Sequence, residues 1–282
     1  MKKFVLFSLL FAIPLMAQPK GKLLIIGGGS RPAYMMNKFI ELAGGFDAKI
    51  VIVPNASELP RDEAWDHSSE FVKLGCKNVK ALYFNREQVD SPENLEALEG
   101  ATGIFFSGGD QAKLFREVGK SKFFDKIKDI YEKGGMIGGT SAGAAVMSKV
   151  MITGNELIVH DSDYVFFTVH ANNVETVEGF GFLDNVIIDQ HFIVRKRLNR
   201  LICATIEHQL PGIGIDESTA ILVEDGRYFT VVGESGVVIV NPTTGKKLKN
   251  NKNGMLSARD ITMHLLMDGD RYDMKTNTIL TK

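Results

Sequence analysis

Short aliphatic runs alternate with longer amphipathic stretches along most of the chain. The runs predicted to be strands are residues 22–26, 49–53, 79–84, 103–106, 135–137 and 186–188. The stretches with hydrophobic residues at helical spacing are residues 34–42, 61–74, 112–118, 123–133, 142–148 and 192–207. This alternation predicts an α/β fold with a mostly parallel central sheet and helices on both of its faces.

The last part of the chain has a pattern typical of antiparallel strands. Residues 212–232 contain two β-rich runs around Asp225-Gly226, a strong hairpin-turn signal, and a further run at 237–240 follows Gly236. No linker rich in Pro or Ser precedes them. We therefore expect a C-terminal antiparallel extension of the same sheet, within a single domain spanning residues 18–282, and a solvated loop at the lysine-rich residues 246–253.

The first segment predicts a secretion signal. Lys2 and Lys3 give a positively charged start, residues 4–16 form an apolar run, and Ala17 follows as a small residue. The run is shorter than the roughly 20 residues that a membrane-spanning helix needs. We expect residues 1–17 to be a signal peptide that is removed, which leaves an exported protein, periplasmic or secreted, with no membrane partner.

Composition limits the remaining classes of function. The chain is 44% hydrophobic and 24% charged, as in ordinary globular proteins. Its 33 Lys and Arg residues against 34 Asp and Glu give no positive excess, so nucleic acid is not an expected partner. Cys76 and Cys203 match no zinc pattern and are too few for a disulfide scaffold. A weak metal-binding pattern consists of His160, Asp161, Asp163 and His170, and no metal or cofactor is expected.

The clearest chemical signal is residues 138–144 (Gly-Gly-Thr-Ser-Ala-Gly-Ala), which follow a predicted strand and precede a predicted helix. This is the context of a nucleophile elbow, where small residues flank a serine in a sharp turn. Ser141 is the candidate nucleophile, and the amide of Ala142 at the helix start is a candidate oxyanion-hole donor. The alternative is a tight turn in which Ser141 only caps the helix.

A second glycine-rich loop ends the neighbouring strand at residues 105–111 (Phe-Phe-Ser-Gly-Gly-Asp-Gln). Because the carboxyl ends of parallel strands face one crevice, this loop is expected to meet the elbow. Gly109 would supply the second oxyanion-hole donor, and Gln111 could hold a substrate amide. The alternative is a glycine turn with Asp110 capping the next helix.

A serine nucleophile needs a base and an orienting acid. Of six histidines, His191 is best placed, because it follows the predicted strand 186–188 and precedes a predicted helix. The residues alone do not decide which carboxylate orients this histidine. The candidates are Glu156, Asp161, Asp163 and Asp216.

Three arginines follow His191 at positions 195, 197 and 200. On the predicted helix Arg197 and Arg200 lie about 60° apart and flank an apolar face, whereas Arg195 falls on the other side. Two guanidinium groups beside a catalytic histidine could fork onto a substrate carboxylate. The alternative is a solvated basic face.

Together these motifs resemble the cyanophycinase family of serine peptidases, which also contains the aspartyl dipeptidases. The resemblance rests on residues 138–144, on Ser-Gly-Gly-Asp-Gln at 107–111, on Asp-Gln-His-Phe at 189–192 with its three arginines, and on Gly-Ile-Gly-Ile-Asp-Glu at 212–217. These motifs span roughly residues 22–241. The resemblance implies a fold similar to that of class I glutamine amidotransferases, which is flavodoxin-like.

It also implies hydrolysis of cyanophycin, a poly-aspartate backbone that carries arginine on its side-chain carboxyls, to β-Asp-Arg dipeptides. Ser141 would be the nucleophile and His191 the base. The family's acidic member does not map cleanly onto one position of this sequence, and Glu156, fifteen positions after Ser141, is taken as the acid. The residues implied to line the substrate site are Gln111, Asp189, Gln190, Arg195, Arg197 and Arg200. A homodimer is expected.

Three rival interpretations remain. The first is an exported aspartyl dipeptidase of the same family. The second is a nucleotide-binding protein, indicated by residues 27–30 (Gly-Gly-Gly-Ser), although Pro32 replaces the third glycine of that motif and Pro54-Asn55 stand where an acidic ribose ligand is expected. The third is a periplasmic binding protein that keeps the fold without turnover.

Overall fold

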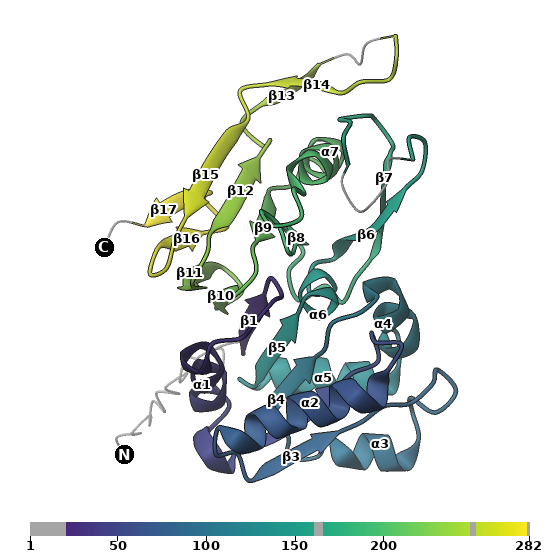
Figure 1. Ribbon diagram of the computed structural model, residues 1–282, viewed down its shortest axis with the longest axis vertical. Coiled ribbons are helices and arrows are strands. Elements are labelled where there is room, and N and C mark those ends of the chain that lie inside the picture. The colour runs from purple at the N-terminus through teal and green to yellow at the C-terminus, as the bar shows by residue number, and fades with distance from the viewer. Residues whose placement is uncertain (1–20, 161–165, 249–251, 281–282) are drawn as a thin grey trace, which may run out of the picture.

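A nine-stranded sheet runs through the middle of the protein (Figure 1). The computed structural model describes residues 21–160, 166–248 and 252–280. The strands of this sheet are β1 (Lys22–Ile26), β2 (Lys49–Val53), β3 (Asn78–Ala81), β4 (Gly103–Phe106), β5 (Met136–Thr140), β10 (Thr219–Glu224), β11 (Tyr228–Gly233), β16 (Arg271–Asp273) and β17 (Thr278–Leu280). Their order is β17-β16-β11-β10-β1-β5-β4-β2-β3. The five neighbouring strands β1, β5, β4, β2 and β3 pair in parallel. On the other side of β1, the strands β10, β11, β16 and β17 continue the sheet in antiparallel pairing.

Helices cover both faces of the parallel part, as predicted. They are α1 (Ala33–Leu42), the short 3-10 helix η1 (Gly45–Asp47), α2 (Pro60–Lys73), α3 (Pro92–Ala97), α4 (Gln111–Val118), α5 (Lys122–Glu132) and α6 (Ala142–Ala145). Strand side chains alternate between faces, so Leu24 and Ile26 of β1 pack with α1 and α2, whereas Leu23 and Ile25 pack with α3 to α6. The α/β, flavodoxin-like class predicted from the sequence is confirmed.

A second, four-stranded sheet holds elements that we expected in the first. It consists of β8 (Ile187–Asp189), β9 (Gly212–Ile215), β12 (Val237–Asn241) and β15 (Thr262–Leu266), in the order β15-β12-β9-β8. The predicted strands 186–188 and 237–240 therefore do not extend the central sheet. A side chain at Gly212 would meet Leu201 at 2.5 Å, and one at Gly214 would meet the ring of Phe192 at 2.3 Å. Because Gly212 and Gly214 have no side chains, the helix that carries Leu201 and the ring of Phe192 can pack directly on β9. This packing forms the core of the second sheet.

The helix that covers this second sheet is shorter than predicted. Helix α7 is Leu198–His208, not 192–207, because Lys196 inside the predicted range has a left-handed φ of 52° that a helix cannot contain; His191, directly before that range, also has a left-handed φ, of 46°. The chain makes an irregular turn between them. The predicted hairpin at Asp225-Gly226 is confirmed: these residues have φ of 55° and 61°, and β10 pairs with β11.

Two small antiparallel pairs complete the described structure. They are β6 (Val150–Glu156) with β7 (Val174–Glu178), and β13 (Lys246–Leu248) with β14 (Ser257–Arg259). The predicted loop 246–253 therefore begins as a strand, and its residues 249–251 lie outside the described residues. The predicted signal peptide, residues 1–17, also lies outside them.

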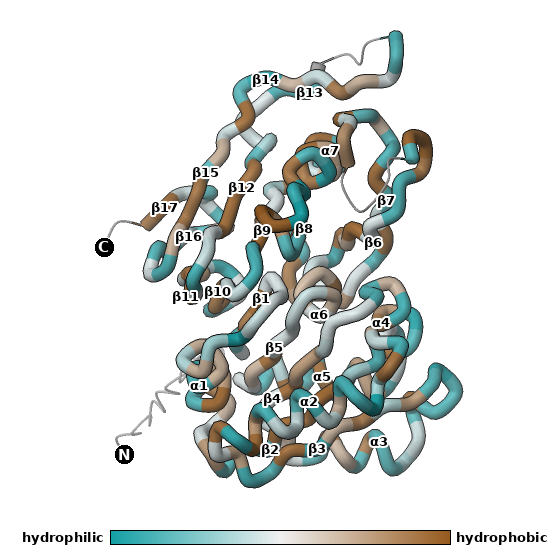
Figure 2. Tube along the Cα trace, in the orientation of Figure 1, coloured by the Kyte–Doolittle hydropathy of each residue, from teal (hydrophilic) through white to brown (hydrophobic). Residues whose placement is uncertain are grey.

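Hydrophobic residues follow the strands closely. Figure 2 shows hydrophobic colouring along β9 and β12 of the second sheet. No helix in residues 21–160, 166–248 or 252–280 is both long enough and apolar enough to span a membrane.

Candidate active site

Ser141 occupies a sharp turn between β5 and α6, at the carboxyl end of a central parallel strand. Its backbone angles are φ 55° and ψ −110°, a strained conformation that costs about 1–3 kcal/mol. Gly139 and Gly143 permit the turn: an added Cβ would lie 2.3 Å from the Gly143 carbonyl oxygen in the first case and 2.4 Å from the Phe106 carbonyl oxygen in the second. Ser141 makes no side-chain capping bond to α6, which lies wholly within the described chain. The structure thus has the geometry of an elbow and not that of a capped turn.

Ser141, His191 and Glu217 form one hydrogen-bonded line. The Nε2 atom of His191 lies 2.9 Å from Ser141 Oγ, and its Nδ1 atom lies 2.5 Å from Glu217 Oε1. Because a carboxylate can only accept, His191 donates through Nδ1, and Nε2 is left to accept the Ser141 proton. The imidazole comes from the end of β8 in the second sheet and reaches across to the elbow in the first.

The acid that contacts His191 is Glu217 and not the expected Glu156. Glu156, at the end of β6, accepts a hydrogen bond from Asn173 Nδ2 at 3.1 Å. The alternative Asp216 accepts from the amides of Ile193 and Val194 at 2.9 and 3.0 Å. The remaining alternatives, positions 161 and 163, lie outside the described residues. Sequence pattern missed Glu217 because neighbouring residues after β9 point to different sides of the chain, and only one of them faces the histidine.

The glycine loop after β1 packs against His191 and Glu217. An added Cβ at Gly28, whose φ is +112°, would lie 2.3 Å from the His191 ring, and one at Gly29, whose φ is +70°, would lie 2.8 Å from Glu217 Cβ. The backbone amide of His191 also donates to the Gly27 carbonyl at 2.7 Å. Close approach to the imidazole accounts for the run of glycines that the nucleotide-binding interpretation relied on.

The loop after β4 lies beside the elbow, as expected. A Cβ at Gly108 would lie 3.8 Å from Ser141 Oγ, whereas the Cα of Gly109 packs on the Ala56 carbonyl, where an added Cβ would come within 2.2 Å. Asp110 caps α4 by accepting from the amide of Ala112 at 2.7 Å. Both sequence interpretations of this loop therefore find support: it meets Ser141, and it caps a helix.

Gln111 is buried at the start of α4. Its Nε2 donates to the carbonyls of Ile152 and Thr153 on β6, at 2.8 and 2.7 Å. Both N–H groups of the amide are thereby engaged, so Oε1 is the atom that it can offer to a substrate.

Two of the expected substrate residues pair with each other. Arg200 Nε donates to Asp189 Oδ2 at 2.8 Å, and Arg200 Nη2 donates to Asp189 Oδ1. Asp189 and Arg200 are 1% and 3% exposed. Asp189 Oδ1 also accepts from the Gln190 amide at 2.8 Å. Instead of forking onto a ligand, Arg200 neutralises the buried carboxylate at the end of β8.

The other two arginines differ sharply in environment. Arg197 is 4% exposed and donates from Nη1 to the Gln190 carbonyl at 2.7 Å. Burial, with a further contribution from Arg200, lowers the pKa of Arg197 to about 10. Within the described part of the chain, Arg197 Nε and Gln190 Oε1 are buried polar atoms without a hydrogen-bond partner. Arg195 is exposed.

The pKa of His191 is lowered from its ordinary value. Burial is the main cause, the hydrogen bond to Glu217 opposes it, and the positive charge of Arg195 adds to the lowering. The neutral imidazole, which is the form that can accept a proton, therefore exists at lower pH than for an exposed histidine.

We expect Arg195→Ala to raise the pKa of His191, because a nearby positive charge is removed. The acid limb of the profile of kcat/KM against pH, which reports the base of the free enzyme, should then move to higher pH. Arg195→Lys, which keeps the charge, is the matched control. A limb that stays in place or moves to lower pH in Arg195→Ala would contradict the assignment of His191 as the base.

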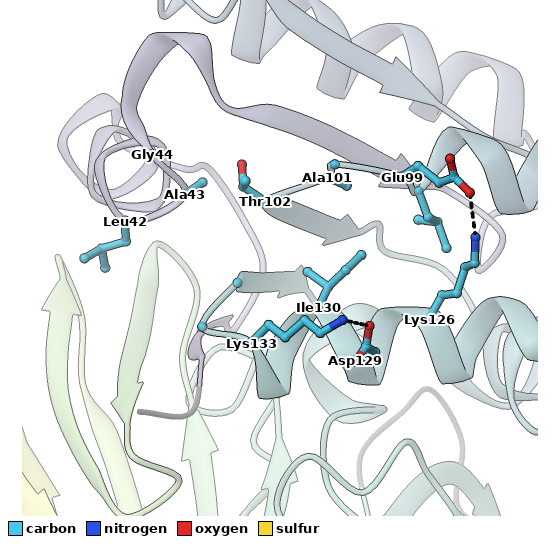
Figure 3. Close-up of a pocket in the computed structure, with 14 residues that line it drawn as sticks. Leu42, Ala43, Gly44, Glu99, Ala101, Thr102, Lys126, Asp129, Ile130 and Lys133 are labelled. Carbon is cyan, nitrogen blue, oxygen red and sulfur yellow. Dashed lines mark hydrogen bonds and ion pairs between the residues drawn. The ribbon is translucent and has the colours of Figure 1, made fainter. Parts of the chain in front are cut away.

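A cavity of about 510 Å³ lies at the opposite edge of the central sheet, where β4 and β5 begin (Figure 3). Its charged side chains are paired, Lys126 with Glu99 at 3.3 Å and Lys133 with Asp129 at 2.6 Å. Ligands of open α/β sheets bind at the carboxyl ends of the strands, which is the edge that carries Ser141. The cavity is therefore separate from the candidate active site.

The weak metal pattern finds no support among the described residues. His170 Nδ1 hydrogen-bonds the Ala171 carbonyl at 2.7 Å, and positions 161 and 163 lie outside the described chain. No group of three or more His, Cys, Asp or Glu residues in the described ranges could hold a metal ion.

A serine hydroxyl within reach of an imidazole that a carboxylate orients, at the carboxyl edge of a parallel sheet, defines the class of serine hydrolases. The sequence model of peptidase family S51 matches residues 23–231, so the chain belongs to this family and is a serine-type peptidase. It is 33% identical over 270 residues to a cyanophycinase of Geminocystis herdmanii, covering 92% of this chain and 95% of that one. It is also 33% identical over 275 residues to a cyanophycinase of Thermosynechococcus vestitus, covering 93% and 82%.

A solved structure agrees with this assignment. The crystal structure of a peptidase from an acI-B1 Actinobacterium superimposes with a TM-score of 0.65 at 26% identity, covering 91% of this chain and 98% of that one. The family resemblance stated from the motifs is thus confirmed.

Proposed function

We propose that this chain is an exported cyanophycinase-like serine exopeptidase that hydrolyses cyanophycin to β-Asp-Arg dipeptides. The observation that carries the proposal is the line from Ser141 through His191 to Glu217, with contacts of 2.9 and 2.5 Å. Similarity to the cyanophycinases over more than nine-tenths of the chain supports the choice of substrate.

In the proposed reaction Ser141 Oγ attacks the scissile carbonyl carbon while His191 Nε2 takes its proton. The imidazolium then donates this proton to the leaving amine, and an acyl-enzyme remains on Ser141. Water, deprotonated by the same imidazole, hydrolyses the ester and restores the hydroxyl. Glu217 holds the imidazole in the required tautomer and stabilises its charged form.

The negative charge that develops on the carbonyl oxygen needs donors beside Ser141. The proposed donors are the amides of Ala142 and Gly109, from the two loops that meet at the elbow. The close approach of this loop to the elbow supports the proposal, since a Cβ added at Gly108 would lie 3.8 Å from Ser141 Oγ.

A β-linked aspartyl unit leaves a free α-carboxylate that requires a paired cation. The proposed partners are the guanidinium groups of Arg195, which is exposed, and of Arg197, whose Nη1 also lies 3.9 Å from Asp189 Oδ1, with Gln190 and Gln111 as polar neighbours. The buried ion pair between Asp189 and Arg200 would hold the neighbouring residues Gln190 and Arg197 in place.

Export and assembly complete the proposal. Residues 1–17 would act as a signal peptide, so that the mature chain begins at Gln18 and works in the periplasm or outside the cell. The mature protein would be a homodimer. An exported enzyme fits the use of polymer released by other cells.

The test is to incubate the purified protein with insoluble cyanophycin and, in parallel, with simple Asp-X dipeptides, and to identify the products by mass. We expect one dipeptide mass, that of β-Asp-Arg, from the polymer. Cleavage of the dipeptides alone would establish the aspartyl dipeptidase instead. Absence of cleavage in both, with a folded protein, would favour a binding protein.

A further inference from the structure

Asp216 and Glu217 are adjacent carboxylates that serve different partners. Glu217 orients the His191 ring, whereas Asp216 accepts three hydrogen bonds elsewhere. Asp216 Oδ1 accepts from the amides of Ile193 and Val194, and its Oδ2 accepts from Ser235 Oγ at 2.7 Å. Asp216 is 3% exposed, so it is a buried group whose hydrogen bonds are made inside the protein.

The amides that Asp216 holds belong to the turn directly after His191. This turn begins with the left-handed φ of 46° at His191, which is unfavourable for a residue with a side chain. Its backbone closes through the Arg195 amide on the His191 carbonyl at 3.0 Å and the Arg197 amide on the Phe192 carbonyl at 2.9 Å. Asp216 anchors the middle of the turn to the segment that carries Glu217.

We propose that Asp216 is a positioning residue that fixes the distance between the His191 turn and the Glu217 segment, and so keeps His191 Nε2 at Ser141 Oγ. This inference rests on the proposed function. Asp216 acts through the backbone of residues 193 and 194. A misplacement of the base by about 1 Å can cost about 10²-fold in rate, so a hydrogen-bonded anchor here matters to the reaction.

The role requires acceptor atoms and not a negative charge. An asparagine at this position keeps Oδ1 for the two amides, and its Nδ2 can donate to Ser235 Oγ. Glu217 differs, because its charge stabilises the imidazolium that forms during the reaction. The two carboxylates are therefore separable by replacing each with its amide.

The experiment compares Asp216→Asn, Asp216→Ala, Ser235→Ala and Glu217→Gln in the full-length protein. The readout is the second-order rate constant for labelling of Ser141 by a fluorophosphonate probe, followed by intact mass, with thermal melting to show folding. We expect a loss of about 10–100-fold in Asp216→Ala, about threefold in Ser235→Ala and at most about threefold in Asp216→Asn. Glu217→Gln should lose far more than Asp216→Asn.

The outcomes separate the inference from the proposed function. If the wild type is not labelled at Ser141, the proposed function fails, and the inference fails with it. If the wild type is labelled but folded Asp216→Ala reacts at the same rate, only the inference is overturned. Should Asp216→Ala not fold, the labelling rate of Ser235→Ala is compared with that of the wild type instead. An unchanged rate in folded Ser235→Ala would then overturn the inference. A loss in Asp216→Asn equal to that in Glu217→Gln would overturn it too, because the charge would then be what matters.

Discussion

Ser141→Ala is expected to lower kcat for peptide hydrolysis by about 10⁶-fold, the loss seen when a serine nucleophile is removed from an intact site. Alanine fits the elbow without new contacts, because only the hydroxyl is lost. His191 would then have no group to deprotonate except water. The measurement is kcat with cyanophycin, alongside binding of the polymer, which should persist.

The matched control for this substitution is Ser69→Ala on α2, which should keep wild-type kcat. Retention of hydrolysis in a folded Ser141→Ala protein would show that another group attacks the substrate. Equal losses in the two variants would point to damage of the fold, which melting curves would reveal.

Glu217→Gln is expected to lower kcat by about 10³–10⁴-fold, with KM changed little. Glutamine has nearly the same shape, but it carries no charge, and its N–H can donate to Nδ1 and so stabilise the wrong tautomer of His191. The acid limb of the pH profile should also move to lower pH. Glu217 raises the pKa of His191 in the wild type, and its loss lets burial lower that pKa further.

Glu156→Gln is the matched control, since Glu156 is the residue taken as the acid in the sequence analysis, where Asp161, Asp163 and Asp216 are the alternatives. It should keep kcat within about threefold of wild type, because Glu156 accepts from Asn173 whereas the His191 ring is held by Glu217. A large loss in Glu156→Gln with little loss in Glu217→Gln would contradict the role given to Glu217.

Local pattern predicted most of the parallel half of the fold, although it missed α3 and gave 79–84 for the strand β3, which is Asn78–Ala81; it did not predict the second sheet. Strands β1 and β4 are short hydrophobic runs followed by glycine-rich loops, and the structure places them as predicted. The second sheet depends on nonlocal pairing of β8 and β12 with β9, and nothing in their own sequences distinguishes it from the first sheet. Helix α7 begins later than predicted, at Leu198, because Lys196 has a left-handed backbone angle that the sequence around it does not indicate.

The site was predictable where local sequence signals mark its residues, and not where the choice depends on the fold. Ser141 and His191 stand at strand ends with recognisable flanking residues, and their side chains meet as expected, although His191 follows a strand of the second sheet and not of the central one. Glu217 could not be separated from Asp216, because the choice depends on which of two neighbouring side chains faces the imidazole. The sequence connects the glycines at 28 and 29 only with a nucleotide-binding motif, whereas in the structure an added Cβ would meet His191 at Gly28 and Glu217 at Gly29.

The proposed mechanism depends on the Ser141 hydroxyl as the reacting nucleophile. Its most direct test is to treat the wild-type protein with a fluorophosphonate probe and locate the adduct by peptide mass mapping. We predict one adduct per chain, on Ser141, with loss of hydrolysis in proportion to labelling. An adduct on any other residue, or full hydrolysis by a protein labelled at Ser141, would contradict the account.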